Sequence, residues 1–181
     1  PTSGYVSSFT QTIPVYADAP YLRNNYRFSK YNAFGEDVIG SFKLFLSSIN
    51  GLQGEDVRLS KRARIPRNRI RGFKPGKIGP RDGTDYIGGN YVAAVNFETS
   101  LPNLLPENSK TDVGLFLDLA NIWGVDYSSS LDDSNTIRSS VGVATSWLSP
   151  IGPLSFILAQ DIAKADTDQT QSFTFNLGTS F

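Results

Sequence analysis

Residues 68–80 read Asn-Arg-Ile-Arg-Gly-Phe-Lys-Pro-Gly-Lys-Ile-Gly-Pro, and alternating strand-like segments lie on both sides of them. They belong to the longest segment without such alternation, at about 51–88. A connection of this length inside a compact domain is either disordered or functional. Because an Arg-Gly-Phe core and several Pro and Gly breaks occupy its centre, we expect a functional loop held by the surrounding strands.

The composition of the 181-residue chain excludes several kinds of site. It contains no Cys and no His, which excludes disulfides, thiolate nucleophiles, most zinc sites and His-based acid–base catalysis. The formal net charge is zero, so no global basic excess indicates a nucleic-acid partner. Because the sequence also contains no Met, we expect a processed product or a fragment of a longer chain.

Eight segments alternate apolar and polar residues with the period of a β-strand. They have 8–13 residues each, close to the length of about 9–11 residues with which a tilted strand crosses a bilayer. No segment indicates a helix, and no apolar run is long enough for a membrane-spanning one. The expected strands are 4–13, 21–31, 37–48, 90–101, 111–123, 137–148, 154–161 and 170–181.

Alternation alone allows either a soluble β-sandwich or a transmembrane barrel, and three features favour the barrel. First, short turns alternate with long connections, as in outer-membrane barrels. Second, aromatic residues lie near strand ends, as at membrane interfaces. Third, the sequence given ends on an aromatic residue of an alternating strand. The short turns are 32–36 and 149–153; the long connections are 51–88, 124–135 and 164–169; the aromatic residues are Tyr91, Trp123, Trp147 and Phe181. The connection at 102–110 is longer than this arrangement favours.

Five motifs, in order along the chain, resemble those of the BamA-type outer-membrane β-barrel assembly factors. Residues 70–73 look like the family's Val-Arg-Gly-Phe/Tyr loop motif, and 86–90 resemble the Gly-Gly-Asn before the next strand. Residues 116–123 are similar to its Phe-x-Asp-x-Gly-x-x-Trp strand, with Ala120 in place of the usual Gly. Residues 147–154 contain its Ser-Pro-hydrophobic-Gly-Pro-Leu turn, and 171–181 resemble its C-terminal strand.

The resemblance implies an all-β fold, an antiparallel transmembrane β-barrel of about sixteen strands. Residues 1–181 would be the C-terminal portion with about eight strands, without the N-terminal strands and the periplasmic domains. The implied function is a non-enzymatic insertase, with no cofactor and no metal, that folds and inserts β-barrel proteins into the bacterial outer membrane. The C-terminus would lie on the periplasmic side.

The resemblance also implies partners. These are unfolded outer-membrane barrel clients, the lipid bilayer with its lipopolysaccharide, and accessory assembly lipoproteins bound through the periplasmic domains. Two alternatives remain. One is a two-partner secretion pore that exports a polypeptide, although the Ser-Pro-Ile-Gly-Pro turn and Gly-Gly-Asn favour the insertase. The other is a complete eight-stranded barrel acting as an adhesin, although the long loop would crowd so narrow a lumen.

In the family, the loop folds into the barrel lumen and its arginine pairs with carboxylates of the inner wall. The matching residues here are Ile70, Arg71, Gly72 and Phe73 in the loop, with Glu98 and Asp118 as the partners. Alternation independently places both carboxylates on the polar faces of neighbouring strands, where the planar fork of a guanidinium could bind them. Gly72 would allow a tight turn, and Phe73 would pack the tip. The alternatives are solvated charges or a catalytic carboxylate pair.

Most of the basic residues fall in or near this loop. Because no aromatic residue interleaves 58–71, a nucleic-acid stacking platform is not favoured. We expect a solvated loop that meets acidic lipopolysaccharide groups or the lumen wall. These residues are Arg58, Lys61, Arg62, Arg64, Arg67, Arg69, Arg71, Lys74, Lys77 and Arg81.

The last strand has an implied role of its own. By the resemblance, it carries the signal by which the assembly machine recognises barrels, and it meets the first barrel strand at a seam. Weak pairing there would form a lateral gate. The residues concerned are Phe173, Phe175, Leu177, Gly178 and Phe181.

Overall fold

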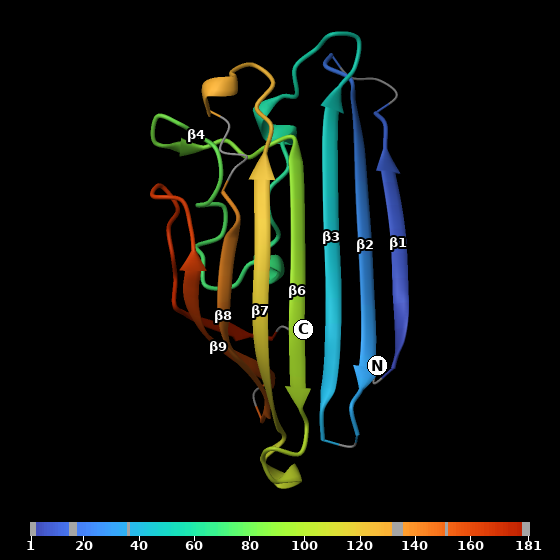
Figure 1. The fold of residues 1–181 in the computed structure, drawn as a ribbon, viewed down its shortest axis with the longest axis vertical. Coiled ribbons are helices and arrows are strands. Elements are labelled where there is room, and N and C mark those ends of the chain that lie inside the picture. The colour runs from blue at the N-terminus through green and yellow to red at the C-terminus, as the bar shows by residue number, and fades with distance from the viewer. Residues whose placement is uncertain (1–2, 15–17, 36, 132–135, 151, 179–181) are drawn as a thin grey trace.

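The computed structural model describes residues 3–14, 18–35, 37–131, 136–150 and 152–178, and β-strands dominate them (Figure 1). None of the helices in this part of the chain is long and apolar enough to cross a membrane. The main strands are β1 (Gly4–Thr12), β2 (Tyr21–Ala33), β3 (Ile39–Gly51), β6 (Tyr91–Leu101), β7 (Thr111–Trp123), β8 (Arg138–Ser149), β9 (Gly152–Ala163) and β10 (Phe173–Leu177). The smaller elements are β4 (Arg81–Asp82), β5 (Asp85–Tyr86) and the 3-10 turns η1 (Leu59–Lys61), η2 (Arg67–Arg69), η3 (Glu107–Ser109) and η4 (Ser129–Leu131).

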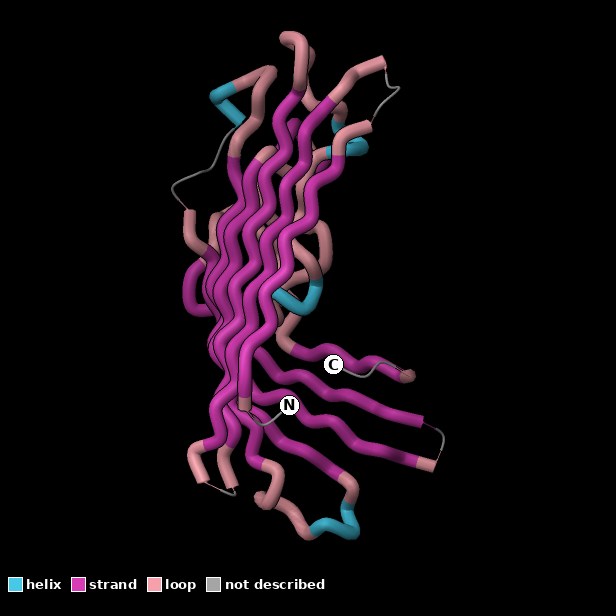
Figure 2. Tube along the Cα trace, turned by 90° about the vertical axis from the view of Figure 1, so that its right-hand side faces the viewer, coloured by secondary structure: helices cyan, strands magenta, loops and turns pink. Residues whose placement is uncertain are grey.

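The eight main strands form one antiparallel sheet in the order β1-β2-β3-β6-β7-β8-β9-β10. The sheet bends sharply across its width, so that the lower parts of its later strands turn away from the earlier ones (Figure 2). Its two edges, β1 and β10, do not pair with each other among the described residues. The predicted all-β antiparallel fold is therefore confirmed.

The last strand is shorter than predicted. The expected segment was 170–181, but only Phe173–Leu177 pairs with β9. Thr170 instead forms a bridge with Phe73 of the long loop, because the chain leaves the sheet before β10. Phe181 lies outside the described residues.

Short and long connections separate at opposite ends of the strands. Residues 34–38, 102–110 and 150–151 connect strands at one end, and 13–20, 52–90, 124–137 and 164–172 at the other. Gly178, directly after β10, lies at the short-turn end, where its N–H donates to the Pro153 carbonyl at 2.8 Å. This is the predicted alternation except at 102–110, a connection as long as 164–172 that lies at the short-turn end.

One face of the sheet, called the outer face, exposes large apolar side chains. Phe97 is 47% exposed and Leu115 50%, although both belong to strands in the middle of the sheet. Tyr91 and Trp123 stack with ring centroids 5.8 Å apart at the long-loop end, and Trp147 lies near the other end of β8. An apolar face bordered by aromatic residues is typical of a surface that meets lipid.

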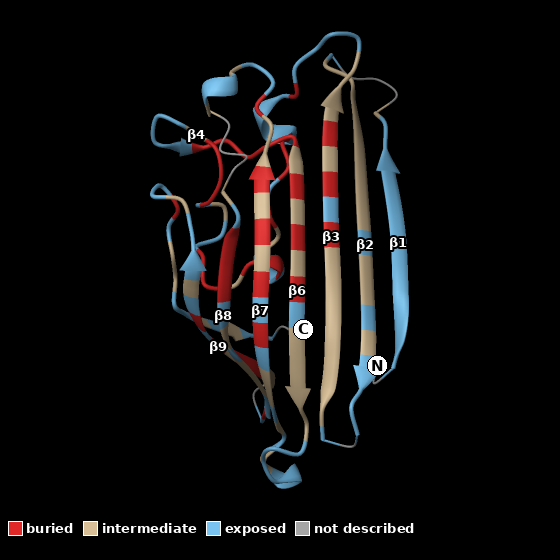
Figure 3. Ribbon diagram, viewed as in Figure 1, coloured by how far each residue is buried: buried red, intermediate tan, exposed pale blue. Residues whose placement is uncertain are grey.

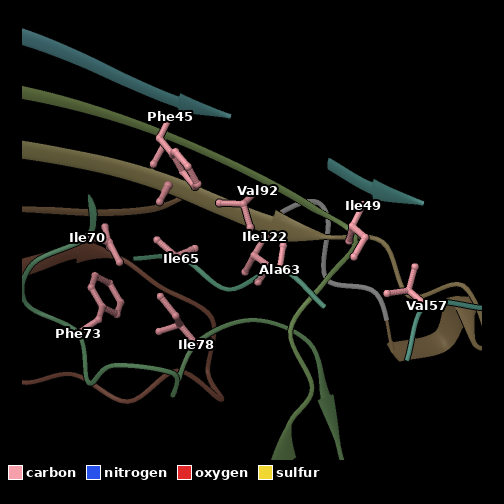
Figure 4. Packing of buried hydrophobic residues seen from close by; sticks show 12 residues of the cluster. Phe45, Ile49, Val57, Ala63, Ile65, Ile70, Phe73, Ile78, Val92 and Ile122 are labelled. Carbon is pink, nitrogen blue, oxygen red and sulfur yellow. The ribbon is translucent and has the colours of Figure 1, made fainter. Parts of the chain in front are cut away.

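The opposite, inner face is covered by the long loop (residues 52–90), which brings the buried core together (Figures 3 and 4). Phe45, Ile49 and Ile122 point inward from the strands and pack against loop residues such as Ile70 and Phe73. Alternation in the sequence predicted polar inward faces, and for this part of the sheet that prediction is wrong. The docked loop excludes water there, so apolar side chains are stable on both faces.

Candidate functional site: a loop ion-paired to the inner face

Local geometry brings the Arg-Gly-Phe turn against the sheet. Gly72 has a φ of +88°, a left-handed conformation that favours glycine. A side chain at this position would also lie 3.0 Å from the Cβ of Ala159 on β9. The neighbouring Ile70 and Phe73 are buried in the core cluster. The turn therefore presents the Arg71 side chain to β6 and β7 while its flanking residues hold the loop in place.

The Arg71 guanidinium binds both carboxylates. Its Nε donates to Oδ2 of Asp118 at 2.7 Å, and its Nη2 to Oδ1 at 2.6 Å. The same Nη2 lies 2.7 Å from Oε1 of Glu98. The backbone N–H of Arg71 adds a bond of 2.9 Å to Asp118, and the guanidinium carbon lies 3.8 Å from the ring centroid of Phe116. A bidentate, charge-assisted pair of this kind is among the stronger polar contacts in proteins.

Strand register explains why the acceptors lie side by side. Asn96 pairs with Asp118 across β6 and β7, and Glu98 follows two residues later on the same face. Asn96 was not among the predicted site residues, yet its amide donates to Asp118 at 2.7 Å and to the Arg69 carbonyl at 3.0 Å. Glu98 is also bound by Lys43 of β3. The inner face therefore supplies a network of charged and polar groups that fits this loop.

A second ion pair, not among the predicted site residues, joins β8 to the loop between β9 and β10. Nε of Arg138 donates to Oδ2 of Asp168 at 2.8 Å, and neither side chain is exposed to solvent. Asp168 also accepts the backbone N–H of Gly79 from the long loop at 3.2 Å. Alternation places Arg138 on the polar face of its strand. Asp168 lies in a loop, however, and alternation does not predict where a loop residue points.

A third contact fixes the start of the long loop. Asp126, in the connection after β7, accepts the Val57 N–H at 2.7 Å and the Asn90 side-chain amide at 3.2 Å. It also pairs with the buried Arg62 guanidinium. Burial alone would raise the pKa of Asp126, but these donated hydrogen bonds and the arginine charge outweigh it and hold the pKa below its ordinary value.

We expect this carboxylate to titrate at unusually low pH. Because folding lowers its pKa, Asp126 stabilises the loop fully above its ordinary pKa of about 3.9 and loses that contribution as pH falls through the lower, folded value. The Val57 amide proton, followed by NMR, should shift with that low midpoint. In Asp126→Asn the titration should disappear. A midpoint at or above the ordinary value would contradict the prediction.

Some of the basic residues of the long loop are buried, and the others are exposed to solvent. The residues Arg62 and Arg69 are buried, and Arg71 is mostly covered. For these three the prediction of a solvated loop is wrong. Arg69 and Arg71 find their acceptors on the inner face, as expected for a loop that meets the lumen wall. The acceptors of Arg62 lie instead at the long-loop end of the sheet, at Asn90, Gly124 and Asp126. Most of the others are exposed, namely Arg58, Lys61, Arg64, Arg67, Lys74 and Lys77.

The predicted residues of the last strand lie away from this ion-pair site. Phe173, Phe175 and Leu177 are 53%, 49% and 58% exposed on the outer face of the edge strand. Gly178 follows them with a φ of +77°. None of them contacts Arg71 among the described interactions. The structure therefore brings Arg71, Glu98 and Asp118 together and places the last strand at the sheet edge.

The fold and the docked loop agree with one protein family. The model of the Omp85 superfamily domain matches residues 1–181, and the chain belongs to this superfamily. The predicted resemblance to BamA-type proteins is thereby confirmed at the level of the family.

Individual relatives carry BamA names. The outer membrane protein assembly factor BamA of Neorickettsia risticii is 28% identical over 168 residues, covering 91% of this chain and 22% of that protein. BamA of Neisseria meningitidis serogroup B is 30% identical over 139 residues, covering 62% of this chain and 17% of that protein. The crystal structure of BamA from Haemophilus ducreyi lacking POTRA domains 1–3 superposes with a TM-score of 0.85, at 27% identity, over 97% of this chain and 38% of that one. The chain thus spans about a fifth of the length of these curated relatives.

Proposed function

We propose that this chain is the C-terminal portion of the barrel of an outer-membrane assembly factor. The observation that carries the proposal is the Arg-Gly-Phe loop, ion-paired to Asp118 and Glu98 on the inner face of an Omp85-type sheet. About eight further strands would close the barrel between β1 and β10, the two edges that lack a second neighbour here. The parent protein would fold and insert β-barrel clients into the bacterial outer membrane.

The mechanism we propose is non-enzymatic. In the site, Arg71 binds both carboxylates, Lys43 supplies the second positive charge at Glu98, and the guanidinium stacks on Phe116. The arrangement therefore positions a loop instead of supplying a free acid or base. The short-turn end and the C-terminus would face the periplasm, and the apolar outer face would contact lipid. Clients, the bilayer with its lipopolysaccharide, and accessory lipoproteins bound through periplasmic domains would be the partners.

The edge strand β10 is suited to form one side of a seam in the barrel wall. Its ladder with β9 has only five residues, from Phe173 to Leu177, whereas β9 and β8 pair over most of their length. A short ladder separates at lower cost than a long one, and an unpaired edge is a template for another strand. We propose that β10 meets the first barrel strand weakly, and that client strands add where this seam opens.

The experiment that tests the function uses the parent chain, with its remaining strands, in liposomes. We expect the folding of an urea-unfolded client barrel to accelerate, and Arg71→Ala to remove the acceleration. Ion conductance should be recorded in the same vesicles. Conductance without acceleration would overturn the proposal in favour of a polypeptide-exporting pore.

A further inference from the structure

The chain segment just before the edge strand pairs with the long loop and not with the sheet. The Gln171 N–H donates to the Gly72 carbonyl at 2.9 Å, and the Lys74 N–H to the Gln169 carbonyl at 2.9 Å. The Gln169 N–H in turn donates to the Lys77 carbonyl at 3.0 Å. Together with the bridge between Phe73 and Thr170, these bonds form a short antiparallel ladder. The Arg-Gly-Phe turn is thus directly hydrogen-bonded to the approach of β10.

This ladder replaces sheet pairing at the long-loop end of the edge strand. The last contacts between β9 and the C-terminal segment at this end are the Phe173–Leu158 pair and the bond from the Ala159 N–H to the Ser172 carbonyl, at 2.8 Å. Beyond them β9 continues to Ala163 and stays paired with β8, with a shift in register between Ser139 and Ser140. One end of β10 is therefore held by the long loop, and the other by its own short ladder with β9.

A buried carboxylate, that of Asp168, binds the short ladder to the sheet. Asp168 immediately precedes the ladder, and its carboxylate receives donors from three parts of the chain. Arg138 of β8 donates at 2.8 Å and 3.1 Å, the Gly79 N–H of the long loop at 3.2 Å, and the Ala165 N–H of its own turn at 2.7 Å. Because the Asp168 and Arg138 side chains are both fully buried, removing the carboxylate would take this ion pair from Arg138 and one hydrogen-bond acceptor each from Gly79 and Ala165.

We infer that Asp168 and Arg138 are positioning residues that couple the long loop to the C-terminal edge strand, so that undocking of the loop frees one end of β10. Coupling between two sites is reciprocal, so a change at either end must appear at the other. Arg71 anchors the Gly72 turn to β7 through Asp118. Asp168 anchors the other strand of the ladder to β8 through Arg138. All of these contacts lie within the chain, so the coupling does not depend on the assembly activity.

Hydrogen–deuterium exchange on the parent chain in lipid nanodiscs tests this inference. In Asp168→Ala we expect amide exchange to rise roughly tenfold or more both at 72–79 and at 173–177, since a hydrogen-bonded buried anchor is lost. The matched control is Asp166→Ala, which removes an exposed carboxylate from the same turn and should leave both segments unchanged.

The reciprocal variant separates coupling from local damage. Arg71→Ala should raise exchange at 173–177, although Arg71 has no described contact with β10. The double variant should add less than the two single changes together, because each already frees the same ladder. If Asp168→Ala loosens only 164–170, or if Arg71→Ala leaves 173–177 protected, the coupling is wrong. Should Asp168→Ala fail to fold, the Arg71→Ala result alone decides.

Discussion

Alanine in place of Arg71 should release the long loop from the inner face, weakening its docked state by about 3–5 kcal/mol. The reason is the carboxylate left behind, because the Asp118 side chain is 0% exposed and loses its bidentate partner. Glu98 would keep Lys43. Limited proteolysis of the folded parent chain should then give new cleavage within residues 52–90.

Two further variants sharpen this prediction. Arg71→Lys should be intermediate, because a lysine keeps the charge but cannot form the planar two-pronged contact. Arg67→Ala removes an exposed arginine from the same loop and should not change the cleavage pattern. If Arg71→Ala were cleaved no faster than Arg67→Ala, the ion pair would not be what holds the loop.

The second large effect is expected at Gly142 of β8. A methyl group built there would lie 2.1 Å from the Leu158 carbonyl oxygen and 2.6 Å from Cζ of Phe116, the ring on which Arg71 stacks. Gly142→Ala should therefore separate β8 from β9 or displace that ring, at a cost of about 1–3 kcal/mol or more. Urea denaturation of the folded parent chain, followed by Trp fluorescence, measures this cost.

Gly40 of β3 supplies the matched control. The three atoms nearest to a methyl group there all belong to the ring of Phe34, the far end of a flexible side chain, and the closest is 2.7 Å away. Gly40→Ala should cost clearly less than Gly142→Ala, since the Phe34 ring can rotate away. Equal losses for the two variants would mean that the crowding at Gly142 is relieved by a movement of the strands.

Alternation in the sequence predicted most of the sheet. The expected strand 111–123 agrees with β7, and the shared face of Glu98 and Asp118 follows from a period of two. The period of two could not predict that Arg71 pairs with these carboxylates, because a loop residue has no periodic position. The expected ion pair came from the family resemblance. The functional roles of the loop and of the last strand stay proposals.

The contacts that the sequence did not predict share one physical origin, namely that they depend on where the connections between strands fold. Asp168 follows a polar turn and carries no signal that distinguishes it from the exposed Asp166, so its pair with Arg138 depends on three-dimensional packing. Phe45 and Ile49 point inward because the loop covers them, and a strand considered alone does not show what covers it. The sequence therefore predicted the ladder of strands better than the contacts made by the long connections.

The position of the loop's partners along the chain has a consequence for the order of folding. The loop ends at residue 90, but Asp118 and Asp168, which bind it, both follow it in the sequence, as does Arg138, the ion-pair partner of Asp168. The loop cannot dock until β7, β8 and the turn after β9 have formed, and contacts between such distant residues form slowly. Docking would thus be a late event that reports whether the last strands have taken their places.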